Sequence, residues 1–140
     1  MKDQTQIPPA NQEVEMGTIA LRMVLTGLLF LFTIVFGVWL SNSGKPLNTL
    51  IFTIHKLTAL AAVVFTVIMI HNLLKNVEAK VIILTLIVVV GLSALALFIS
   101  GVLLSLGKPV NNIVLTIHRI MTIVTVISTA VTIYLLAGRK

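Results

Sequence analysis

The chain has no cysteine, and this absence removes several kinds of site at once. Without cysteine there is no disulfide, no thiolate metal ligand, no cysteine-ligated iron–sulfur cluster and no haem attached through paired cysteines. Acidic residues are also scarce, and all four lie outside the long apolar stretches: Asp3, Glu13, Glu15 and Glu78. Acid–base catalysis and proton-coupled export within a membrane usually need a carboxylate there. The sequence therefore favours neither class.

Apolar residues make up 58% of the 140 residues and gather in four runs. Each run exceeds the roughly 20 residues that cross a bilayer core. Because backbone groups in lipid must be hydrogen-bonded internally, each run is predicted to form a helix. The runs are Ile19–Leu40, Leu47–Leu74, Val81–Leu104 and Val110–Ala137. We therefore predict an all-α membrane protein with short connections and no soluble domain.

The formal net charge of +6 comes from Lys and Arg at the ends of these runs. Basic residues at helix ends orient membrane proteins and meet anionic headgroups, so the expected partner is the lipid bilayer and not nucleic acid. More of them lie on the side of the termini, which predicts cytoplasmic termini in a prokaryotic inner (plasma) membrane. That side holds Lys2, Arg22, Lys75, Lys80, Arg139 and Lys140, and the other holds Lys45, Lys56, Lys108 and Arg119.

A stretch of the chain occurs twice: residues 44–57 match residues 107–120, with seven identical positions at one offset (118 − 55 = 63). We divide the chain into a flexible polar tail (1–17), a first repeat (18–77) and a second repeat (78–140). Two crossings in each repeat preserve its orientation, so the repeats should be parallel and related by an axis along the membrane normal. The predicted fold is a four-transmembrane-helix bundle built from two parallel two-helix repeats.

Each repeat carries a histidine at the same position within an apolar helix, His55 in the first and His118 in the second. An ionisable side chain in the membrane is costly unless something satisfies it. Bis-histidine haem binding needs two neutral imidazoles at matched depth, each oriented by a hydrogen-bond partner. Parallel repeats bring both histidines in at the same depth, and bundles build cofactor sites from facing helices. We predict that His55 and His118 are the axial iron ligands of one haem b.

The neighbours of the two histidines complete the predicted site. Small side chains on the histidine faces leave room for a porphyrin, although such stripes also occur in ordinary membrane-helix packing. The cations that follow the histidines are predicted to bind the haem propionates. Lys45 and Lys108, in the turns, have either that role or contact with lipid phosphates. The predicted cofactor-binding residues are His55, His118, Lys56, Arg119, Asn48, Asn111, Ala62 and Thr125.

Other interpretations of the histidines remain open. They could hydrogen-bond across the helices without a cofactor, or one could ligate a chlorophyll-type pigment. A zinc site is disfavoured, because two histidines without Cys, Asp or Glu are an incomplete ligand set. His71 follows His55 by 16 residues (71 − 55 = 16), which places it nearly on the opposite helix face. Its counterpart in the second repeat is Tyr134 (134 − 71 = 63), so we interpret His71 as an interfacial residue.

Four helices with histidines on the second and fourth resemble small membrane-embedded b-type cytochromes, including quinone-linked membrane anchors and ferric-reductase-like electron carriers. The resemblance implies electron transfer through a low-spin haem, with a redox protein or a quinone as partner. It implies an electron carrier or a subunit of an oxidoreductase complex rather than a stand-alone enzyme, either as a homo-oligomer or within a larger membrane complex. The alternative is a cofactor-free structural or assembly subunit.

Overall fold

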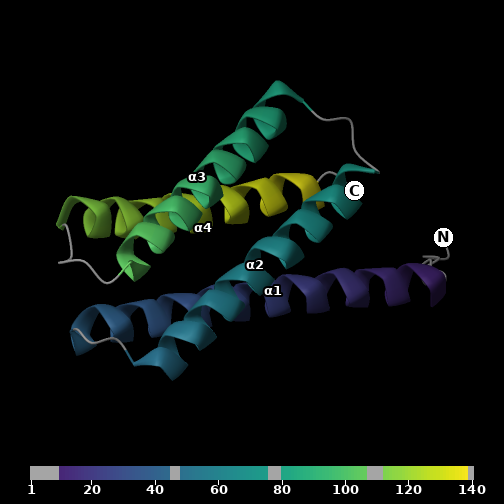
Figure 1. The fold of residues 1–140 in the computed structure, drawn as a ribbon. Helices are drawn as coiled ribbons and strands as arrows, with labels where there is room; N and C mark the ends of the chain where they lie inside the picture. Colours follow the sequence, from purple (N-terminus) through teal and green to yellow (C-terminus); the bar gives the residue numbers. More distant parts are fainter. Residues whose placement is uncertain (1–9, 45–47, 76–79, 107–111, 139–140) are drawn as a thin grey trace, which may run out of the picture. The chain divides into compact units, whose positions relative to one another are not determined.

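Four long helices make up the part of the chain that the structure describes, which is residues 10–44, 48–75, 80–106 and 112–138 of a computed structural model. No strand occurs among these residues. The helices follow one another along the chain as shown in Figure 1. They are α1 (Ala10–Ser43), α2 (Thr49–Leu74), α3 (Val81–Ser105) and α4 (Asn112–Ala137).

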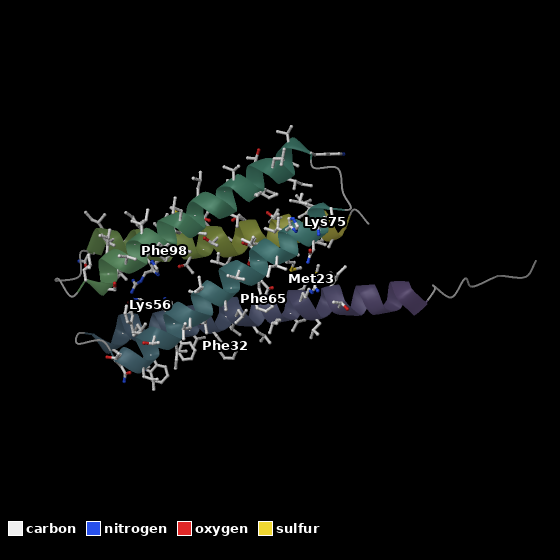
Figure 2. The ribbon with its side chains drawn as sticks, turned by 45° about the vertical axis from the view of Figure 1, so that its right-hand side comes forward. Met23, Phe32, Lys56, Phe65, Lys75 and Phe98 are labelled. Atoms are coloured by element: carbon white, nitrogen blue, oxygen red, sulfur yellow. The ribbon has the colours of Figure 1, made fainter. Side chains whose placement is uncertain are left out.

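Every one of these helices is long and apolar enough to span a membrane. Large apolar side chains remain exposed along all four, as expected where lipid and not water is the surrounding solvent. Phe98 on α3, labelled in Figure 2, is 69% exposed. The structure thus confirms the predicted all-α class with four spans, and the protein is an integral membrane protein.

The first helix begins earlier than the sequence predicted. We expected residues 1–17 to be a flexible tail, but α1 starts at Ala10 and runs for 34 residues. At 1.5 Å per residue this is about 51 Å, well beyond the apolar thickness of a bilayer. The polar start was mistaken for a tail because it lacks an apolar pattern, yet Ala, Gln, Glu and Met are good helix formers. The membrane-spanning part is Gly17–Ser43.

A glycine and an asparagine define the turn between α1 and α2. Gly44 follows the last residue of α1 with φ of 69°, the left-handed conformation that commonly terminates a helix and favours glycine. Asn48 precedes α2, and its side-chain oxygen accepts hydrogen bonds from the backbone N–H groups of Leu50 and Ile51. This is N-capping, which fixes the start of the helix.

The chain divides into two compact units, residues 1–62 and 63–140, with the boundary inside α2. In the second unit α3 and α4 run antiparallel in direct contact. Ser93 contacts Thr125, and Ser100 contacts His118. The residue numbers of both pairs sum to 218 (93 + 125 and 100 + 118), so the two helices keep one register over this length.

The internal repeat extends from the sequence into the burial pattern. Along the two histidine helices, four of the five buried residues of each helix recur at the same offset of 63. Along the other two helices, glycines recur at an offset of 64 (91 − 27 and 101 − 37). The buried pairs are Ala62 with Thr125, Thr66 with Thr129, Met69 with Thr132, and Leu73 with Leu136.

Candidate functional site

The two histidines lie at the same distance from the starts of their helices. His55 is six residues after Thr49 (55 − 49 = 6), and His118 is six residues after Asn112 (118 − 112 = 6). Six residues of helix rise about 9 Å, which is inside the apolar layer and short of its middle. Both side chains are partly buried. His55 belongs to the first compact unit and His118 to the second.

The ring of His55 is held by the backbone of α1. Its Nδ1 lies 2.9 Å from the carbonyl oxygen of Thr33. A carbonyl oxygen can only accept, so Nδ1 carries the proton and donates it. In the neutral imidazole the lone pair is then on Nε2.

A glycine of α1 makes room for this ring. A Cβ placed on Gly37 would lie 3.1 Å from Cε1 of His55 and 3.6 Å from its Nδ1. The distance to Cε1 is tighter than most real Cβ contacts, so with a larger residue at this position the ring would have to move by a few tenths of an ångström. Gly37 is one helical turn after Thr33 and therefore lies on the same face of α1.

In the second hairpin, a serine side chain replaces the backbone carbonyl. Nδ1 of His118 lies 2.8 Å from Oγ of Ser100. That hydroxyl also lies 2.7 Å from the carbonyl oxygen of Ala96. When the hydroxyl donates its single proton to this carbonyl, its oxygen accepts from Nδ1 of His118, which is the same tautomer as in His55. A Cβ on Gly101 would lie 3.5 Å from Cε1 of His118, an ordinary contact.

Both histidines thus have Nδ1 bonded to the preceding helix, and in the tautomer shared by the two rings the lone pair is on Nε2. A metal-ligating histidine has this arrangement, because the hydrogen bond at one ring nitrogen fixes the tautomer and the ring orientation for the other. The same bonds also link neighbouring helices and satisfy a polar group in the membrane. The donor set is therefore chemically suited to ligate iron and also stabilises each hairpin.

The cation after His55 has a described contact of its own. The Nζ atom of Lys56 lies 4.1 Å from the ring centre of Phe52, one turn toward the start of α2, in a cation–π contact. Figure 2 shows Lys56 and Lys75 toward opposite ends of α2. Arg119 is exposed, and the residue equivalent to Phe52 in its helix is Leu115 (52 + 63 = 115), which offers no ring.

The remaining predicted site residues have separate positions. Asn48 caps α2 through its side-chain oxygen. Ala62 is buried on α2. Thr125 is buried on α4 and lies within hydrogen-bond distance of Ser93 Oγ and the Met121 carbonyl oxygen. The predictions for Asn111, Lys45 and Lys108 fall outside the described residues.

Four residues that contact the histidines were missed by the sequence reasoning. The histidines were paired at an offset of 63, whereas the glycines that face them are related by an offset of 64. Aligning the first and third helices on these glycines would have placed a glycine opposite each histidine. The missed residues are Thr33, Gly37, Ser100 and Gly101.

His71 lies in the last turn of α2 and is exposed. Among the described residues, no group of three or more His, Cys, Asp or Glu side chains is placed to hold a metal ion. No model of a known protein family matches the chain, and no curated protein or solved structure matches it either.

Proposed function

We propose that this protein is a membrane-embedded electron carrier that binds one haem b between His55 and His118. The observation that carries the proposal is the shared state of the two rings. Nδ1 of each ring lies within hydrogen-bond distance of an oxygen on the preceding helix. With the proton on Nδ1, the lone pair of each neutral ring is on Nε2. Two imidazoles in this state are the ligand set of a bis-histidine haem.

The internal repeat supports the pairing of these two residues. Both histidines stand six residues inside their helices, and each faces a glycine on the preceding helix. Iron ligated from both sides of a flat ring needs two donors at matched depth. Each repeat is predicted to cross the membrane twice, so the two repeats are parallel and bring their histidines to the same depth.

A bound haem b supplies one-electron chemistry, and the protein groups around it position it and exclude other reactions. Thr33 and Ser100 orient the histidine rings through the hydrogen bonds to Nδ1. Lys56 and Arg119 are the candidates for neutralising the propionates. The apolar spans contain no carboxylate, so these residues form an environment suited to electron transfer rather than acid–base chemistry.

A cofactor-free structural or assembly subunit is the second candidate. The observation favouring it is that each histidine makes a hydrogen bond to the neighbouring helix of its own hairpin. Such bonds alone give a membrane histidine a stabilising role, worth roughly 0.6 kcal/mol on average in a helical membrane protein.

The absorption spectrum of the protein, purified from cells supplied with a haem precursor, separates the two functions. Electron transfer predicts one haem per chain by haemochrome assay and a sharp band in the reduced state. A colourless protein that remains folded and does not take up added haemin would instead establish the structural role.

A further inference from the structure

The buried hydroxyl groups of this protein follow one rule with two exceptions. Eight Ser and Thr residues are buried among the described residues, and six donate to a carbonyl oxygen in the preceding helical turn. Thr66 and Thr129 do not, and each has a buried Oγ1 with no hydrogen-bond partner among the described residues. Each is only 3% exposed. A buried hydroxyl without a partner costs free energy, so each exception needs an explanation.

The two exceptions occupy the same position of the repeat. Thr66 follows His55 by 11 residues and Thr129 follows His118 by 11, so each lies about 16 Å further along its helix on nearly the same face. This position is near the opposite end of each helix from the histidine. It therefore belongs to a different region from the proposed haem site.

The surroundings of the two hydroxyls on their own helices differ. The neighbours of Thr66 are apolar: Ala62 four residues before it and Met69 three residues after it. Thr129 has Thr125 and Thr132 at the same two positions, and both are buried. Their hydroxyls lie within donating distance of carbonyl oxygens of Met121 and Ser128, which leaves their oxygens able to accept.

We propose that Thr129 marks a hydration site inside the second hairpin. A water molecule there accepts the proton of Thr129 and donates to the hydroxyl oxygen of Thr125, one turn earlier. Residues four apart on a helix have Cβ atoms about 5–6 Å apart, a distance that one bridging water spans. Buried waters make between about two and four such bonds to polar groups.

The site extends a polar seam that runs along the interface of α3 and α4. The seam contains the Ser100–His118 and Ser93–Thr125 pairs, and the buried Thr132 lies two turns after Thr125 on nearly the same face of α4. Thr66 lacks hydroxyl neighbours on its own helix, so the same reasoning assigns it no water. The inference does not depend on haem, because it concerns hydroxyl groups on the other half of α4.

Transfer of magnetisation from water to threonine side chains, measured by solid-state NMR on the full chain in lipid bilayers, tests the proposal. A water cross-peak is expected for Thr129 and none for Thr66, which serves as the matched position. Absence of the peak at Thr129, or a peak at Thr66 of equal or greater intensity, overturns it.

Thermal unfolding of isosteric variants gives a second readout. Thr129→Val removes the donor to the water and should lower Tm by about 2–4 °C. Thr66→Val removes a hydroxyl without a partner and should leave Tm unchanged or raise it. A Thr129→Val protein at least as stable as the wild type also overturns the hydration site, whatever the haem content of either variant.

Discussion

The two hairpins follow one template but differ in polarity at matching positions. At five positions α3 and α4 carry buried hydroxyl groups, whereas α1 and α2 carry apolar residues there. The repeat therefore fixes the positions, and the residue at each one decides whether it is polar. The corresponding residues are Leu29 and Ser93, Phe36 and Ser100, Ala62 and Thr125, Phe65 and Ser128, and Met69 and Thr132.

The histidines show what this difference means for a site. His55 donates to the backbone carbonyl of Thr33, a group that no substitution removes. His118 donates to the Ser100 side chain, which a single substitution removes. Both arrangements allow the same tautomer. In the second hairpin a substitution can remove the hydrogen-bond acceptor of the histidine, whereas in the first a substitution can only change the packing around the ring. The following experiments use that contrast.

The largest effect is expected from removing either histidine. His55→Ala and His118→Ala should each reduce haem content to background, because one remaining axial ligand leaves the iron loosely held. His71→Ala is the matched control and should retain haem. Haemochrome assays of the three purified variants measure this. Equal haem content in all three would mean that the ligands are wrongly assigned.

The glycines should respond unequally. Gly37→Ala brings a Cβ to 3.1 Å from His55 and should cost about 1–3 kcal/mol of stability, with loss of haem. Gly101→Ala makes an ordinary 3.5 Å contact with His118, and alanine in a helix is favoured over glycine by about 0.5–1 kcal/mol. Thermal unfolding and haem content of both variants make the comparison. Equal tolerance would contradict the close approach of His55 to α1.

Ser100→Ala should have a moderate effect that is confined to the second hairpin. It removes the hydrogen bond to His118 Nδ1, worth about 0.5–1.5 kcal/mol. A ligand without that acceptor is less basic and donates less to ferric iron, so the midpoint potential should rise.

The control for Ser100→Ala is Ser105→Ala, which removes an exposed hydroxyl bonded to its own helix. A redox titration compares the two variants. Identical potentials would show that Ser100 acts only in packing.

The smallest effect is expected from the cations after the histidines. Lys56→Gln combined with Arg119→Gln should weaken haem retention and slightly lower the midpoint potential. Both side chains are exposed, and ion pairs in exposed positions are worth only about 0–1 kcal/mol. Lys75→Gln, at the other end of α2, is the control. An unchanged potential with full haem occupancy would leave Lys56 only its contact with Phe52.

Much of the fold could be predicted from the sequence, because spans are set by apolar length. The predicted ends of the second, third and fourth helices agree with the structure within three residues. The start of α1 was wrong, since helix formation does not need an apolar pattern. The partners of the histidines were missed for another reason: the register between two helices depends on side-chain packing, which hydrophobic runs do not encode. Only the paired glycines, Gly37 and Gly101, carried that information.

The central claim is that His55 and His118 ligate the same iron. Electron paramagnetic resonance of the oxidised wild-type protein, with haem and chain quantified in the same sample, tests it most directly. The account predicts a low-spin ferric signal of two imidazole ligands at one spin per chain. A high-spin signal of five-coordinate haem, or a bis-imidazole signal at half a spin per chain, would contradict it.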